Sequence, residues 1–138
     1  MDSIEILLIE DSEGDILLTK KALERGRFKN NLHVVHDGEE AIKFLTSPNA
    51  IRPDLILLDL NLPRVNGHEV LKFAKTTEDL KRIPIIILTT SESEKDVSQT
   101  YDLHANGYIV KPVDVSQFFD VVSQIQDFWF TVVKLPDK

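Results

Sequence analysis

The feature that most constrains the fold is a set of five short apolar runs, separated by stretches with helical character. Each run is rich in Ile, Leu or Val and ends in polar or turn-forming residues, a pattern typical of strands buried in a parallel sheet. The runs cover residues 4–9, 32–35, 55–58, 85–88 and 108–110. The helical stretches cover residues 12–25, 39–45, 67–76, 93–103 and 115–129. This alternation predicts an α/β fold in which helices cover both faces of a parallel sheet.

The last helical stretch carries a wider apolar arc than packing against one sheet requires. Its buried face is predicted from side chains at offsets of four, seven and eleven residues, namely Phe118, Val122, Ile125 and Trp129. Three further apolar side chains lie beside that face, namely Phe119, Val121 and Phe128. Part of this helix could therefore face a partner rather than the sheet.

Composition excludes several classes of protein. A net charge of −7 argues against nonspecific nucleic-acid binding, which needs clustered Lys and Arg side chains facing phosphates. The absence of cysteine rules out disulfides and thiolate metal sites, and fits a reducing compartment such as the cytoplasm. The first residues lack the basic start of a signal peptide, and the apolar runs are too short to span a membrane. We expect a single compact domain with no membrane association.

Polar side chains that could bind a ligand or take part in a reaction lie at the ends of four of the five predicted strands. They are Glu10 and Asp11 after the first strand, Asp59 after the third, Thr89 after the fourth and Lys111 after the fifth. In an open α/β sheet the ligand crevice lies outside the carboxyl ends of the strands. We therefore expect these side chains to meet at one rim of the sheet.

Three carboxylates at one rim predict a bound cation. They would repel one another and raise one another's pKa unless a positive charge neutralised them. Mg²⁺ is the natural ion, because it takes one or two carboxylates with phosphate oxygens and keeps several waters. Asp11 and Asp59 could bind it directly and Glu10 through a water. The backbone carbonyl of Asn61 could add a further ligand.

Asp59 in this setting could act as a nucleophile toward phosphorus. Such a carboxylate needs mainly alignment and neutralisation of the equatorial phosphoryl oxygens. Beside Mg²⁺, Lys111 can pair with one of these oxygens as a point charge, and the Thr89 hydroxyl can donate to another. The predicted product is an acyl phosphate on Asp59, with a charge of roughly −2.

Each of these residues also has an ordinary structural explanation. Asp11 or Ser12 could simply cap the first helix, Thr89 could be a β-forming residue, and Lys111 a surface lysine. Two other functions of the same topology fit less well. A flavin-binding loop after the first strand would need hydroxyl and glycine residues rather than an acidic segment. A magnesium-dependent phosphatase would need a second acid at the position of Asn61.

The four histidines, at positions 33, 36, 68 and 104, are scattered and form no metal-binding motif.

The same residues resemble the receiver-domain family of two-component signalling over nearly the whole chain. Glu10-Asp11, Asp59, Thr89, Tyr108 and Lys111-Pro112 match the acidic pair, phosphoacceptor, switch hydroxyl, switch aromatic and lysine of that family. The resemblance implies a flavodoxin-like, doubly wound sheet of five parallel strands in the order 2-1-3-4-5, with five helices. It also implies phosphorylation by a sensor histidine kinase or a phosphotransfer protein.

The resemblance further implies how such a domain signals. Thr89 would move toward the phosphoryl group and Tyr108 would swing inward behind it, changing the face formed by the fourth helix, fifth strand and fifth helix. Asn61 and Ser91 hold positions that influence the lifetime of the acyl phosphate, and both are small enough to admit an attacking water. A receiver that keeps the fold only as a protein-binding surface is the remaining alternative.

A narrower resemblance is to small stand-alone regulators that serve phytochrome-type kinases. It is carried by the segments 55–63, 79–84 and 101–104, and by Phe128-Trp129 followed by Leu135-Pro136. In that group the last helix and the tail contribute to a homodimer. Such regulators tend to carry Ser after the lysine, whereas this chain has Pro112. We expect a receiver domain over residues 1–130 and a tail over 131–138 with no output domain, so that a partner protein receives the signal.

Overall fold

Five parallel strands form the central sheet of the computed structural model, which describes residues 3–26 and 28–136. The strands are β1 (Ile4–Ile9), β2 (Asn30–Val35), β3 (Leu55–Leu58), β4 (Ile85–Thr89) and β5 (Gly107–Val110). Their order in the sheet is β2-β1-β3-β4-β5, as the resemblance to the receiver family implies. Each strand lies within two residues of its apolar run, because burial on both faces favours these Ile-, Leu- and Val-rich segments.

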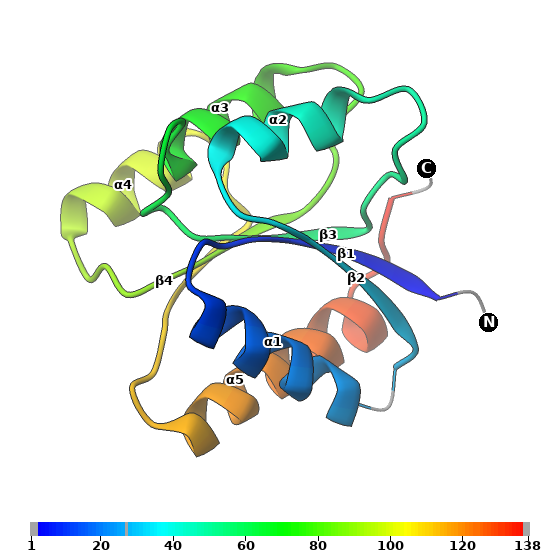
Figure 1. Ribbon diagram of the computed structural model, residues 1–138, viewed down its shortest axis with the longest axis vertical. Helices are drawn as coiled ribbons and strands as arrows, with labels where there is room; N and C mark the ends of the chain where they lie inside the picture. The colour runs from blue at the N-terminus through cyan, green and yellow to red at the C-terminus, as the bar shows by residue number, and fades with distance from the viewer. Residues whose placement is uncertain (1–2, 27, 137–138) are drawn as a thin grey trace.

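Helices cover both faces of the sheet, with α1 and α5 on one side and α2, α3 and α4 on the other (Figure 1). Their bounds are α1 (Glu13–Arg25), α2 (Gly38–Thr46), α3 (Gly67–Thr76), α4 (Glu94–Asp102) and α5 (Val115–Asp127). The sequence predicts one last helix over residues 115–129, but a π-helix, Phe128–Val132, replaces its final turn. The Val133 N–H donates to the Phe128 carbonyl, and the wider turn lets Phe130 pack edge-on against Phe28.

The two faces of the sheet bury separate apolar cores. In β1, Ile6 and Leu8 pack in a core with α1 and α5, whereas Leu7 and Ile9 pack in a core with α2 and α3. β3 and β4 divide their side chains in the same alternating way, because successive strand residues point to opposite faces. Packing from both sides therefore fixes the strand ends that carry the candidate site.

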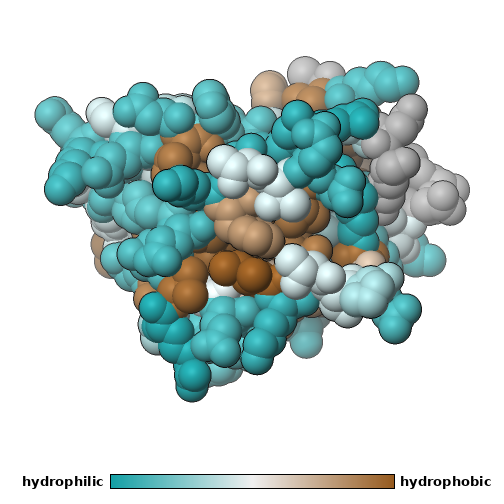
Figure 2. Space-filling model, turned by 90° about the horizontal axis from the view of Figure 1, so that it is seen from above, coloured by the Kyte–Doolittle hydropathy of each residue, from teal (hydrophilic) through white to brown (hydrophobic). Residues whose placement is uncertain are grey.

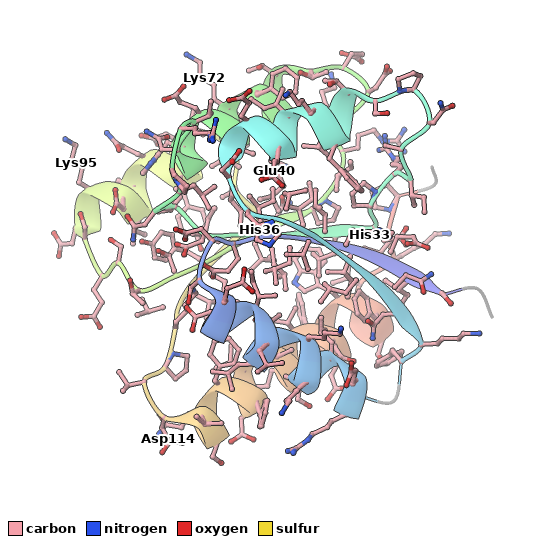
Figure 3. The ribbon with its side chains drawn as sticks, viewed as in Figure 1. His33, His36, Glu40, Lys72, Lys95 and Asp114 are labelled. Carbon is pink, nitrogen blue, oxygen red and sulfur yellow. The ribbon has the colours of Figure 1, made fainter. Side chains whose placement is uncertain are left out.

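Each α-helix begins at a side-chain cap, in which the cap oxygen accepts an N–H three residues further on. The caps are Ser12, Asp37, Asn66, Ser93 and Asp114, the last of which is labelled in Figure 3. The ambiguity between Asp11 and Ser12 is thereby settled, because Ser12 caps α1. The Asp11 carboxylate is therefore not used as the cap of α1.

The outer surface is mixed in character. Viewed from above α2 and α3, hydrophilic side chains surround a smaller hydrophobic area near the middle of the face (Figure 2). Lys72 on α3 and Lys95 on α4 project outward at the edge of the molecule (Figure 3). Within residues 3–26 and 28–136, no helix combines the length and the apolar character needed to cross a bilayer.

Candidate functional site

Three carboxylates converge where β1 and β3 end. Glu10, Asp11 and Asp59 each offer an oxygen, and these oxygens lie within 4.8 Å of one another. The main chain positions two of them, because the Glu10 N–H donates to the Val35 carbonyl and the Asp59 N–H donates to the Ile9 carbonyl, each at 3.0 Å. Glu10 and Asp59 are buried, whereas Asp11 is exposed. The arrangement combines two fixed acids with one that solvent can reach.

Lys111 places its ammonium group among these acids. Its Nζ donates to Glu10, to Asp15 Oδ2 at 2.9 Å and to Asp59 Oδ2 at 3.1 Å. Burial alone would lower the pKa of Lys111, but its hydrogen bonds to Glu10 and Asp15 outweigh burial and raise the pKa above the ordinary value. Lys111 is therefore a buried, permanently charged cation in contact with the candidate nucleophile.

The two buried acids differ in protonation. The pKa of Glu10 is raised from 4.5 to about 7, mainly by burial; the contact with Lys111 lowers it in part, and the hydrogen bond with Asp59 and the charge of Asp59 add to the rise. Burial also opposes ionisation of Asp59. Its hydrogen bond with Glu10 and the charge of Lys111 nevertheless hold the pKa of Asp59 below its usual value. Asp59 therefore stays ionised near neutral pH, as a nucleophile must.

The donor set fits a hard divalent cation. Carboxylate oxygens are the ligands that Mg²⁺ and Mn²⁺ accept, and three of them are grouped here without any nitrogen or sulfur ligand. The backbone of Asn61 lies at the same rim, because its N–H donates to Asp59 Oδ1 at 3.2 Å. The Ser12 N–H donates to Glu10 Oε2 at 3.3 Å and helps to orient that side chain. Together these contacts hold the acidic rim in place at the ends of β1 and β3.

Thr89 and Tyr108 lie on the neighbouring strands. Thr89 is fully buried at the end of β4, and its hydroxyl helps to lower the pKa of Asp59. The half-buried Tyr108 donates its hydroxyl to the Ser91 carbonyl at 2.9 Å. The Ser91 hydroxyl donates to Asp96 Oδ2 at 2.6 Å, and Asp96 Oδ1 lies 3.3 Å from His68 Nε2. The candidate switch tyrosine is thus linked through the β4–α4 loop to α4 and α3.

Two residues of the site are not predicted from the sequence. Asp15 contacts Lys111 from the first turn of α1, and no spacing in the sequence signals this contact, because Asp11 lies before the cap and outside the helix. Gly67 begins α3 directly above the end of β3, where an added Cβ would lie 2.5 Å from the Asp59 carbonyl oxygen. No sequence pattern signals that close approach.

Three of the four histidines, His33, His36 and His68, each lie beside a carboxylate outside this group. His33, on the edge strand β2, lies 2.7 Å from Glu5. His36 lies at the end of β2, beside Glu40 at the start of α2, with 3.6 Å between His36 Nδ1 and Glu40 Oε1 (Figure 3). Among the described residues, the single grouping of three potential metal-ligating side chains is Glu10, Asp11 and Asp59.

Comparisons with known proteins agree with this geometry. The family model described as response regulator receiver domain matches residues 6–123. Response regulator Rcp1 of Synechocystis sp. is 44% identical over 135 residues, covering 95% of this chain and 92% of Rcp1. The phosphorylated cyanobacterial phytochrome response regulator RcpA has 44% identity and a TM-score of 0.95, with coverage of 99% of this chain and 100% of RcpA. The Mn²⁺-bound form of Rcp1 has 43% identity and a TM-score of 0.93, with coverage of 97% and 99%. These matches show that the chain belongs to the response regulator receiver domain family.

Proposed function

We propose that the chain is a phosphoacceptor that takes a phosphoryl group onto Asp59. The observation that carries this proposal is the position of Asp59: it is grouped with two other carboxylates and lies 3.1 Å from the Lys111 ammonium, whose charge helps to hold the pKa of Asp59 below its usual value. The metal would be held by Glu10, Asp11, Asp59 and the backbone carbonyl of Asn61. When bound, Mg²⁺ would neutralise charge on the transferred phosphoryl group.

The residues of the chain supply the rest of the chemistry. An Asp59 carboxylate oxygen attacks phosphorus, and the bond from phosphorus to the donor's leaving atom breaks in line. Lys111 pairs with one phosphoryl oxygen, and the Thr89 hydroxyl donates to another. We take the protein to be a signalling phosphoacceptor rather than an enzyme with a separate substrate. Asn61 stands where an aspartyl phosphatase of this chemistry would need its second acid.

The partners follow from the family and from its phytochrome-associated relatives. A sensor histidine kinase or a phosphotransfer protein would be the donor, and the name of RcpA supports a kinase of the phytochrome type. The cytoplasm, where such kinases use ATP, is the compartment we expect. Loss of the Tyr108 bond to Ser91 would alter the surface made by α4, β5 and α5, and an unidentified downstream protein would read that change.

A homodimer through α5 and the tail belongs to the same proposal. Phe128 is half exposed at the end of α5, whereas Phe119 and Val121 pack largely within the chain. Phe119 also lies under the Arg25 guanidinium, 4.6 Å from the ring centre. Most of the apolar arc predicted from the sequence therefore packs within the chain. Phe128 and the segment after it are the part proposed to contact a second copy of the chain.

Incubation with acetyl phosphate and Mg²⁺, followed by intact mass spectrometry, tests the proposed function. Wild type should gain one phosphoryl group, and chelation of the metal should abolish the gain. Asp59→Asn should gain none, whereas Asp120→Asn, which removes an exposed carboxylate of α5, should behave as wild type. Absence of any gain in wild type, or a normal gain in Asp59→Asn, would contradict the proposal.

A further inference from the structure

We infer that Asp15 is a positioning residue that keeps the Lys111 ammonium at the phosphoryl site during transfer, an inference that rests on the proposed function. Lys111 has three N–H donors, and they contact three carboxylates: Glu10, Asp15 and Asp59. Two of these partners change in the reaction. Asp59 becomes an acyl phosphate, and Glu10 would help to hold the metal ion. Asp15 is the partner that neither reacts nor serves as a proposed metal ligand.

Asp15 is itself held in place by the first turns of α1. Its N–H donates to the Ser12 cap at 3.3 Å, and its carbonyl accepts the hydroxyl of the buried Thr19 at 2.8 Å. The side chain is 31% exposed and so remains partly hydrated, whereas the Lys111 side chain is 5% exposed. The contact is therefore an ion pair between a fixed helix and a long flexible side chain.

The flexibility of lysine gives this contact its role. A lysine side chain has four rotatable bonds, and an ammonium group without a fixed partner samples positions away from the transferred group. An ammonium group that is already in position stabilises the negative charge that develops on the phosphoryl oxygens, because the side chain need not move at the moment of transfer. Loss of the Asp15 carboxylate should therefore slow phosphorylation by about five- to tenfold while leaving Mg²⁺ binding in place.

A double-mutant cycle tests whether Asp15 acts through Lys111. The rate of phosphorylation by acetyl phosphate at saturating Mg²⁺ would be measured for Asp15→Ala, Lys111→Ala and the double variant. We expect Asp15→Ala to slow the wild-type protein but to have little further effect in the Lys111→Ala background. Asp15→Glu, which restores a carboxylate at the same position, should recover part of the rate.

Glu13→Ala is the matched control, because Glu13 lies in the same helix turn and carries the same charge but is 84% exposed. It should change the rate by less than about twofold, which separates the Lys111 contact from loss of negative charge near the site. The inference would be overturned if Asp15→Ala and Glu13→Ala slowed phosphorylation equally. It would also be overturned if Asp15→Ala slowed the wild-type protein and the Lys111→Ala protein by the same factor. Failure of wild type to gain a phosphoryl group would instead overturn the proposed function, and this inference with it.

A second measurement does not depend on phosphorylation. Trace labelling with acetic anhydride reports how readily each lysine amine reaches solvent, and Lys111 is buried whereas Lys20 on α1 is exposed. Asp15→Ala should raise the labelling of Lys111 relative to Lys20 several-fold, and Glu13→Ala should leave the ratio unchanged. An unchanged ratio in Asp15→Ala would show that Asp15 does not hold the amine.

Discussion

Replacing Gly67 with alanine should strain the junction between α3 and the strand end that carries Asp59. An added Cβ would lie 2.5 Å from the Asp59 carbonyl oxygen and 2.6 Å from the Leu60 Cα, both of them main-chain atoms. Side-chain Cβ atoms do not approach other atoms so closely, so α3 or the end of β3 must shift by several tenths of an ångström. The Gly67 N–H also donates to the Leu60 carbonyl at 3.0 Å, and that bond would be strained.

The size of the effect follows from two opposing contributions. Overpacking costs about 1–3 kcal/mol, while alanine recovers at most about 1 kcal/mol of helix propensity. The free energy of unfolding should therefore fall by as much as about 2 kcal/mol even if alanine recovers its full helix propensity, a sizeable part of the roughly 5–15 kcal/mol of a typical domain. Because the displaced atoms belong to Asp59 itself, phosphorylation should also slow by about tenfold or more.

Urea unfolding and the acetyl phosphate reaction would measure both effects, with Gly14→Ala as the control. Gly14 lies on the exposed side of α1, where an added Cβ meets nothing nearer than Ser12 Oγ at 4.0 Å. Its replacement should stabilise the protein by about 0.5–1 kcal/mol and leave the rate unchanged. If Gly67→Ala proved as stable as Gly14→Ala and equally reactive, the reasoning from close approach would be wrong.

Three further expectations concern the site and its surroundings. The raised pKa of Glu10 means that its contribution to stability is complete below pH 4.5 and lost as the pH rises through about 7 in metal-free protein. The bound proton must leave when the metal binds, so Mg²⁺ affinity measured by calorimetry should rise from about pH 6 to 8, and Glu10→Gln should flatten this dependence. Ser93→Ala should lower the free energy of unfolding by about 1 kcal/mol in urea titrations, because it removes the α4 cap. Tyr108→Phe should lower it by about 0.5–1.5 kcal/mol through loss of the Ser91 bond, and an unchanged value would mean that this bond adds no net stability.

The approximate bounds of every strand could be predicted from the sequence because they depend on local apolar runs and on their alternation with helices, whereas the strand order came from the resemblance to the receiver family. The meeting of Glu10, Asp59 and Lys111 was predictable for a related reason. Parallel strands end at a common rim, so residues after several strands become neighbours whatever their separation along the chain.

The features that the sequence did not reveal depend on contacts between elements. The Asp15 ion pair requires the distance between α1 and the end of β5, and the approach of Gly67 requires the docking of α3 over β3. The π-helix after α5 reflects the packing of Phe130 against Phe28, two residues far apart in the chain. Each of these is a distance in three dimensions that no spacing along the chain encodes.

The separation of the interior into two cores allows the two sides of the molecule to diverge independently in evolution. The side chains of Ile6 and Leu8 face one core and those of Leu7 and Ile9 face the other, so the strands lie between the two buried cores. A substitution that repacks α3 or α4 therefore need not disturb α1, which supplies Asp15 beside Lys111. Packing changes on the α2–α4 side can therefore alter its outer surface while α1 keeps Asp15 beside Lys111, provided that the close approach of Gly67 to Asp59 is kept.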